Sequence, residues 1–448
     1  MTDSSATSAL PPPPRAYRWL VLVFISLAMF GNYYVYDCIS PMADVLTAQL
    51  GFTDANIGLL QAIYSIPNVF MVLIGGFIID RIGTRKATLA FGTLCLLGAA
   101  TTASADSSAL QSIALTLGRP FGLAADSGIL AVMAAGRLIF GLGAESLIVA
   151  VTTAIAKWFK GKELSFAFGI NLTIARLGSF AALNSPSWAS WAFDDWRKPL
   201  LVSVAFGTFC VTGAIFYWLL ETNADRKYAL GAAGSTDKVV FSDIFRFTRS
   251  YWCIVALCVT FYSGIFPFQT FAVKFFMESH GVSRETGGFL SSMLTLFAMI
   301  FTPLFGLMVD KIGRRSFFMM FGSLLLIPVY FVMAYSSIPL YVPMAVMGIA
   351  FSLIPAIMWP SVAYVVEENK LGTAYGLMTL IQNIGLAGFN LMIGWANDYA
   401  GASVSNPGGY DLGMWIFSCL GFFGLFFAWL LWRSETGAHA HGLESIKA

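Results

Sequence analysis

Long apolar runs alternate with short polar segments along nearly the whole chain. Each of these runs can cross a hydrocarbon layer about 30 Å thick as a helix. Because the backbone of a membrane span must satisfy its own hydrogen bonds, each run is expected to be an α-helix. The pattern predicts an all-α membrane protein with twelve transmembrane helices. The expected spans are residues 18–41, 56–79, 87–105, 129–156, 164–193, 199–220, 251–277, 287–309, 316–335, 339–365, 371–396 and 412–432.

The longest polar stretch inside the chain, residues 222–249, follows the sixth apolar run. It is expected to be a cytoplasmic linker between two six-helix bundles, residues 18–221 and 250–433. Residues 1–17 are polar and proline-rich and lack the pattern of a cleavable signal, so they are predicted to be a disordered cytoplasmic tail. Residues 434–448 are expected to form a second cytoplasmic tail.

The two bundles are predicted to be repeats of one another. The segment Gly76–Lys86 matches Gly306–Arg315 in glycine, aspartate and basic positions, with an offset of 230 residues. A second match, which includes Gly178 and Gly385, has an offset of 207, so the first half holds 23 extra residues, assigned to an outer loop at 105–128. Parallel six-helix repeats related by a pseudo-two-fold axis along the membrane normal place a substrate site at midplane between them.

The basic residues predict the orientation in the membrane. Of the 26 Lys and Arg residues, 19 fall in segments on the side of the N-terminus, 4 in loops on the other side and 3 within spans. Since Lys and Arg accumulate in cytoplasmic loops, both tails are expected in the cytoplasm.

Composition narrows the function classes. The chain is 57% hydrophobic and 11% charged, whereas soluble proteins carry about 25% charged residues. Its six cysteines are scattered without metal-ligand spacing, and its three histidines lie outside the spans. With no nucleotide-binding loop or catalytic triad in the sequence, we expect no enzyme, no cofactor, no metal and no nucleic-acid partner. The expected setting is the lipid bilayer, and the expected state is a monomer.

Two full charges are predicted deep inside the membrane. Glu145 lies twelve residues before Lys157, or roughly 18 Å along a helix. Arg176 lies fourteen residues after Lys162, or roughly 21 Å. Because both helices leave the same membrane face, the charges reach similar depth near midplane. An ionisable group there costs at least about 2.5–3.5 kcal/mol, which marks a functional site or a compensated pair.

The repeat shows that these charges are specific to the first half. At the offset of 207, Glu145 falls opposite Ser352 and Arg176 falls opposite Asn383. A scaffold requirement common to both halves would be charged in both. A structural ion pair between two helices remains the alternative. We favour a transport site that binds a zwitterion, in which the pair opens as the substrate's own ammonium and carboxylate replace each partner.

The loop at 76–86 and its repeat at 306–315 resemble the signature of the major facilitator superfamily. More closely, the chain resembles the lysosomal dipeptide-transporter branch of that superfamily. The segments that carry this resemblance are 33–37, 64–69, 136–146, 158–164, 175–178, 265–276, 371–376 and 381–383. The resemblance implies a dipeptide substrate, with Glu145 on the peptide amine and Arg176 on the carboxylate, moved as the two halves rock. Facilitated diffusion and proton symport both remain open.

The chain departs from the lysosomal members in its targeting features. It has no acidic dileucine signal in its N-terminal tail, and its sequon Asn171-Leu172-Thr173 lies within the fifth expected span. We therefore expect a bacterial relative in the inner membrane.

Further candidates for the substrate site are polar or aromatic residues within spans, each of which could instead be packing or interfacial. Lys274 near the outer end of the seventh span could equally extend to water. Arg137, by contrast, is expected to be structural. The further site candidates are Tyr36, Asp37, Asn171, Tyr262, Lys274, Trp359, Gln382 and Asn383.

Two other functions stay open. An organic-anion or sugar exchanger of the same superfamily would use Arg176 and Lys274 as a cationic site. A non-transporting sensor or scaffold would keep the fold and bind without flux. The pair of repeated basic loops argues against the second of these.

The repeated loops generate a prediction about gating. Such loops are expected to clamp the halves together when the cytoplasmic side is closed, because an aspartate can meet a helix N-terminus or an arginine across the seam. We expect Asp80→Asn to leave expression intact and to slow transport. Uptake by reconstituted protein checks this, and a normal rate would remove the gating role. The gating candidates are Asp80, Arg81, Arg85, Asp310, Lys311 and Arg315.

Overall fold

Twelve long helices dominate the computed structural model, which describes residues 11–118, 127–159, 163–229, 247–367, 370–437 and 440–445. Within these residues eleven spans are long and apolar enough as they stand, and α3, which bends between Met71 and Ile74, brings the total to twelve. The predicted all-α, twelve-helix fold is thereby confirmed. The first half contains α1 (Arg15–Asp37), α3 (Asp54–Ile82), α4 (Thr84–Ala103), α6 (Gly128–Phe159), α7 (Leu164–Leu183) and α9 (Arg197–Lys227). The second contains α10 (Arg249–His280), α11 (Arg284–Ile312), α12 (Arg315–Tyr335), α13 (Tyr341–Val365), α14 (Leu371–Ala400) and α15 (Asp411–Glu435).

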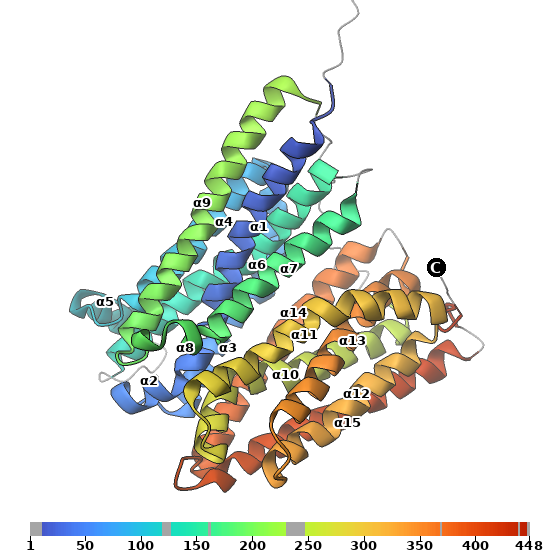
Figure 1. The fold of residues 1–448 in the computed structure, drawn as a ribbon. Helices are drawn as coiled ribbons and strands as arrows, with labels where there is room; N and C mark the ends of the chain where they lie inside the picture. The colour runs from blue at the N-terminus through green and yellow to red at the C-terminus, as the bar shows by residue number, and fades with distance from the viewer. Residues whose placement is uncertain are drawn as a thin grey trace, which may run out of the picture.

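The six helices of each half form one bundle, and the two bundles lie side by side (Figure 1). We call the face where α1 begins and α15 ends the terminal face, and the opposite face the distal face. The distal face carries α2 (Ala43–Leu50), α5 (Ser108–Gly118) and α8 (Ser185–Trp188). The insertion predicted at 105–128 thus contains a helix, while residues 119–126 lie outside the described residues, as does most of the expected linker.

The sequence repeat is visible in the helix ends. Gly51 ends α2 and Gly281 ends α10, both with a left-handed backbone at φ 68° and 64°. Thr53 and Ser283 are the N-caps of α3 and α11, and the hydroxyl of each accepts a hydrogen bond from a backbone N–H three residues on. Glycine suits the left-handed cap because it has no Cβ, and Thr or Ser suits the N-cap. Both pairs are 230 residues apart, the offset found in the sequence.

The first helix of each half differs between the repeats. The helix α1 ends at Asp37, and the chain then passes through a 3₁₀ turn, η1 (Ser40–Met42), into α2. The corresponding segment of the second half is unbroken, because α10 continues through Pro267 to His280. The distal end of α10 is therefore the counterpart of α2.

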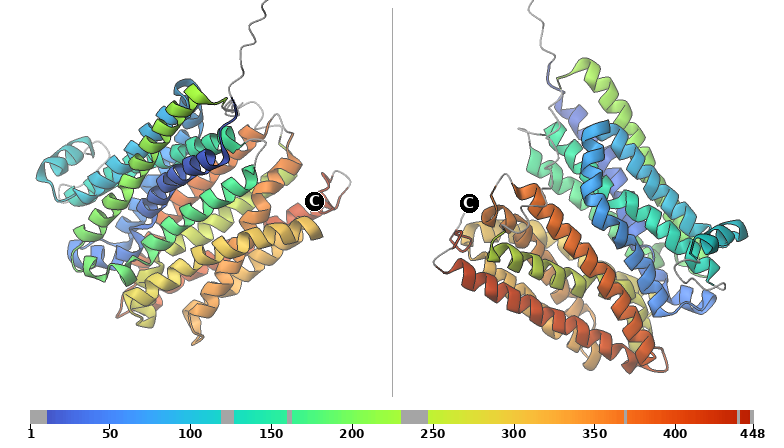
Figure 2. Two further views of the ribbon diagram at one scale, coloured as in Figure 1. Left: turned by 45° about the horizontal axis from the view of Figure 1, so that its top comes forward. Right: turned by 180° about the vertical axis from the view of Figure 1, so that it is seen from behind.

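The bundles touch along two seams, α3 against α14 and α7 against α11 (Figure 2). At the first seam, a Cβ on Gly58 would lie 2.3 Å from the carbonyl oxygen of Asn390. At the second, a Cβ on Gly288 would lie 2.6 Å from the carbonyl oxygen of Leu183. Glycines 58 and 288 are related by the offset of 230, and residues 183 and 390 by that of 207. The seams are therefore pseudo-symmetric close crossings that only glycine permits.

Arg137 holds the first bundle together from inside. Its guanidinium donates to the carbonyl oxygens of Val35 at 2.9 Å and Tyr36 at 3.2 Å, and to Oε1 of Gln61 at 2.5 Å. Its side chain on α6 thereby joins α1 and α3, and it is only 2% exposed. The expected structural role agrees with these contacts.

The seam crossings generate a stability prediction. Gly58→Ala should lower the thermal unfolding midpoint of the purified protein, because the clashing atom is backbone and cannot rotate away; overpacking of this kind costs about 1–3 kcal/mol. Gly169→Ala is the matched control, since a Cβ there meets nothing within 4 Å. Alanine should leave that helix unchanged or slightly more stable. Equal midpoints for Gly58→Ala and the parent would contradict the close seam.

Candidate functional site

A cavity of about 250 Å³ lies between the two bundles. It is lined by α1, α3, α6 and α7 from the first bundle and by α10, α13 and α14 from the second. The sequence likewise predicts a substrate site between the two repeats. Seven of the ten candidate site residues line it: Tyr36, Glu145, Arg176, Tyr262, Trp359, Gln382 and Asn383.

Glu145 enters the cavity from α6. A run of small residues lets α6 pack closely on α3: a Cβ on Gly141 would lie 2.4 Å from the carbonyl oxygen of Tyr64. This packing also brings the hydroxyl of Tyr64 to 3.5 Å from Oε1 of Glu145, to which it donates a long hydrogen bond. The carboxylate is half-buried and faces the cavity beside a neutral donor.

Arg176 enters the same cavity from α7, which is held close to α1 where Gly178 meets the carbonyl of Phe30. The Cζ atom of Arg176 lies 5.8 Å from the ring centre of Tyr33 and 5.2 Å from that of Phe351. Aromatic rings at these distances attract a cation without neutralising its charge. Tyr33 and Phe351 belong to different bundles, so both halves contact the guanidinium.

Glu145 and Arg176 are not paired with one another. Among the described residues no ion pair joins them, and neither forms an ion pair with another side chain. In the part of the chain that the structure describes, the cavity therefore presents one acid and one base, neither of them in an ion pair. A structural pair that locks α6 to α7 would show the opposite arrangement.

The second bundle supplies neutral polar and aromatic groups. Trp359 Nε1 donates a hydrogen bond to the hydroxyl of Tyr262 at 3.0 Å, which fixes both rings at the cavity wall. Asn383 Oδ1 accepts from Asn68 Nδ2 at 3.4 Å, a contact between the bundles. Gln382 also faces the cavity. These amides can bind peptide-like groups by exchanging one hydrogen bond for another.

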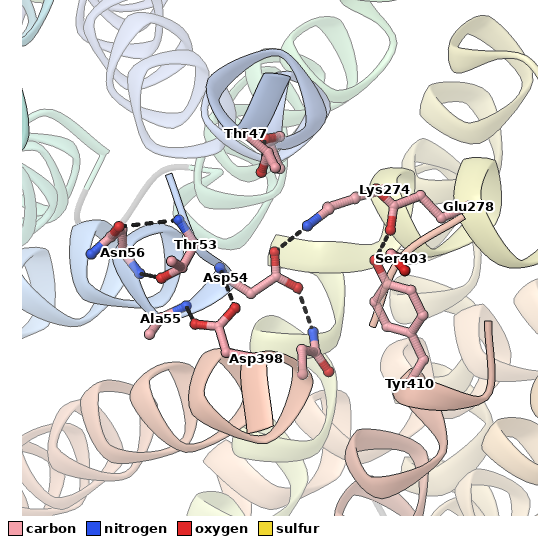
Figure 3. A network of polar contacts seen from close by, with 12 residues as sticks. Thr47, Thr53, Asp54, Ala55, Asn56, Lys274, Glu278, Asp398, Ser403 and Tyr410 are labelled. Carbon is pink, nitrogen blue, oxygen red and sulfur yellow. Dashed lines mark hydrogen bonds and ion pairs between the residues drawn. The ribbon is translucent and has the colours of Figure 1, made fainter. Parts of the chain in front are cut away.

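Three candidate residues lie elsewhere. Lys274 forms an ion pair with Asp54 on the distal side (Figure 3). Asp37, the last residue of α1, is buried and does not line the cavity. Asn171 accepts a hydrogen bond from the hydroxyl of Ser26 at 3.0 Å, and so joins α7 to α1.

Several lining residues were missed in the sequence as members of the site. Helical spacing would have found all of them except Tyr64, whose helix α3 held no substrate-site candidate, because residues three and four apart share a face. Starting from Tyr36 this rule reaches Tyr33 and Asn32, and starting from Tyr262 it reaches Phe266. The missed residues are Asn32, Tyr33, Tyr64, Ile148, Phe266, Thr379 and Leu386.

The repeated loops lie on the terminal face, away from the cavity. Arg85 pairs with Asp225 at 2.7 Å in the first bundle. Arg315 pairs with Asp310 at 2.7 Å in the second. The other gating candidates, Asp80, Arg81 and Lys311, are exposed. Gating by these loops stays a prediction.

Known proteins similar to this chain are membrane transporters. A sequence model of the Major Facilitator Superfamily matches residues 25–273 and 268–445. The lysosomal dipeptide transporter MFSD1 of Danio rerio is 31% identical over 400 residues, which cover 87% of this chain and 83% of that protein. MFSD1 of Homo sapiens is 31% identical over 415 residues, covering 89% and 84%.

Solved structures support the same fold. The D-xylose-proton symporter superposes with a TM-score of 0.71 at 16% identity, over 92% of this chain and 97% of that one. A bacterial homologue of the human lysosomal transporter Spinster, in an inward-facing and occupied conformation, superposes with a TM-score of 0.66 at 17% identity, over 94% and 98%. At these identities the likeness is one of fold alone. The match of the family model to both halves shows that the chain belongs to the Major Facilitator Superfamily.

Proposed function

We propose that the protein transports dipeptides, or zwitterions of similar size, by alternating access of the cavity between its two bundles. The observation that carries this proposal is that Glu145 and Arg176 line one cavity and that neither forms an ion pair among the described residues. In this proposal Glu145 binds the substrate's ammonium group and Arg176 binds its carboxylate.

The electrostatics of the cavity favour a ligand with both charges. Charges removed from water must be compensated, and an uncompensated buried charge is strongly unfavourable. A zwitterion compensates the charges of Glu145 and Arg176 together. A simple anion would leave the charge of Glu145 uncompensated, and a simple cation would leave that of Arg176 uncompensated. The planar guanidinium of Arg176 offers two parallel N–H groups to a carboxylate, while its ring contacts can remain in place.

The neutral walls fit a substrate whose side chains vary. Tyr36, Tyr262 and Trp359 offer apolar ring surface with polar edges, and Gln382 and Asn383 offer amides suited to a peptide bond. The relatives named as lysosomal dipeptide transporters support the same substrate class.

The position of Lys274 argues against the alternative function, an exchanger of organic anions or sugars. It required a second cation beside Arg176, and Lys274 is instead paired with Asp54 outside the cavity. We further propose that the protein works as a monomer in a bacterial inner membrane. The distribution of Lys and Arg over the loops supports a cytoplasmic location of both termini. Uniport and proton symport are separated by the experiment below.

The test uses protein reconstituted in liposomes, with a labelled dipeptide and unlabelled competitors. A free dipeptide should compete well, and its N-acetylated and C-amidated forms should each bind about tenfold to a hundredfold more weakly, the value of a charged hydrogen bond. Glu145→Gln should remove the preference for the free amine, and Arg176→Gln the preference for the free carboxylate. An imposed pH gradient should change uptake only if protons are coupled.

Lys198→Gln is the matched control, because Lys198 pairs with Asp194 on an exposed part of the first bundle, away from the cavity. It should retain parental uptake and both preferences. Equal competition by the free, acetylated and amidated dipeptides would refute the zwitterion site. Selective uptake of sugars or organic anions by Glu145→Gln would favour the exchanger.

A further inference from the structure

The distal ends of the bundles are joined by a buried ion pair. Asp54 begins α3 in the first bundle, and its carboxylate pairs with Lys274 of α10 in the second (Figure 3). The same carboxylate accepts a hydrogen bond from Asn397 Nδ2 at 2.9 Å. The Asp54 and Lys274 side chains are 2% and 5% exposed. The pair is therefore shielded from the solvent that weakens surface ion pairs.

Asp398 reinforces this junction through the backbone. Its two carboxylate oxygens accept hydrogen bonds from the N–H groups of Asp54 and Ala55, each at 2.8 Å. The first N–H groups of a helix have no partner within the helix and carry partial positive charge. The carboxylate of Asp398 on α14 thus caps the N-terminus of α3 across the seam. This contact attaches the start of α3 in the first bundle to the second bundle.

A second ion pair joins the same face. Arg284 begins α11 in the second bundle and pairs with Asp44 of α2 in the first. The guanidinium also lies 5.4 Å from the ring centre of Phe193. Its side chain is 25% exposed and that of Asp44 is 16% exposed, so this pair is nearer to solvent than the first.

The two ion pairs are images of each other under the repeat. The offset of 230 carries Asp44 to Lys274 and Asp54 to Arg284. Each pair therefore joins the position at 44 in one repeat to the position at 54 in the other. The acids both come from the first bundle and the bases both from the second. A chance pair of surface contacts would not obey the pseudo-two-fold axis that relates the bundles.

Further contacts between bundles lie between these pairs and the cavity. The rings of Tyr36 and Phe266, also 230 residues apart, have centres 6.4 Å from each other and both line the cavity. Beyond them, the hydroxyl of Ser40 donates a hydrogen bond to the carbonyl of Gln269. The closed region thus extends from the cavity to the distal ion pairs.

We propose that Asp54–Lys274 and Asp44–Arg284 form a two-part lock that holds the cavity closed toward the distal face and opens as a unit. Because each bundle moves as a rigid body, rotation about the shared axis separates both pairs at once. Both sets of charges then become hydrated, which offsets the lost attraction and keeps the two conformations close in free energy. In this role Lys274 acts in the conformational change and does not touch the substrate.

The test measures access to the closed region directly. Ser40→Cys, in a Cys419→Ser background, places a small thiol at a buried contact between the bundles; the other cysteines in the described residues are buried. A charged maleimide is added to the protein in lipid nanodiscs, without substrate. The neutral double variant Asp54→Asn/Lys274→Gln and the single variant Arg284→Gln should each speed labelling at least about tenfold.

Asp194→Asn is the matched control, because it removes an exposed pair that lies within one bundle. It should label at the parental rate. Asp44→Arg and Arg284→Asp should each speed labelling, and the double exchange Asp44→Arg/Arg284→Asp should restore protection, which general damage to the fold would not do. Should the buried double variant fail to elute as a folded monomer, the more exposed Asp44 and Arg284 variants decide alone.

Parental labelling in Arg284→Gln and both charge reversals would overturn the lock. So would equal acceleration by Asp194→Asn. Because no substrate is present, this outcome is independent of the dipeptide proposal: a working lock with no dipeptide uptake would refute the proposed substrate alone, and dipeptide uptake with no lock would refute this inference alone.

Discussion

A charge placed inside a membrane protein must be compensated, and this requirement orders the interior of the structure. Arg137 is compensated by backbone carbonyls and Gln61. Lys274 is compensated by Asp54. Glu145 and Arg176 face a cavity with a tyrosine hydroxyl and aromatic rings as neighbours, and among the described residues neither forms an ion pair with another side chain. Because these two unpaired charges share a cavity, a ligand that enters it can supply their compensation.

The seams must be tight enough to exclude water and weak enough to separate. Gly58 and Gly288 permit backbone-to-backbone approach, which seals the distal half of each seam with little side-chain area. The polar groups beside these crossings can all be hydrated when they separate. A seam built from large interlocking apolar side chains would resist opening more strongly, since separation would expose that surface to water. Small residues and ionic contacts are thus suited to a reversible junction.

The sequence predicted those features that depend on local pattern. Apolar runs predicted the helices, and the repeated loops predicted two related bundles. Counting residues along the helices from Lys157 and Lys162 predicted that Glu145 and Arg176 lie at similar depth, and both line the cavity. The placement of Lys274 was beyond such reasoning, because its partner Asp54 is 220 residues away.

The sequence around some residues is compatible with more than one structural role. An aspartate at the start of a helix, such as Asp54, is ordinary N-terminal chemistry, so its sequence context gave no sign of a contact with another bundle. Asn171 likewise looks the same in sequence whether it faces a substrate or, as here, Ser26. Tyr64 was found only in the structure, because α3 held no substrate-site candidate from which helical spacing could be counted.

The distribution of charge over the distal pairs has a consequence for assembly. Asp44 and Asp54 are both acidic, and their counterparts Lys274 and Arg284 are both basic. If the first bundle of one molecule met the first bundle of another about the same axis, aspartate would oppose aspartate in both positions; two second bundles would oppose base with base. Like charges at close range repel, so these four positions favour the pairing of a first bundle with a second bundle over the pairing of two like bundles.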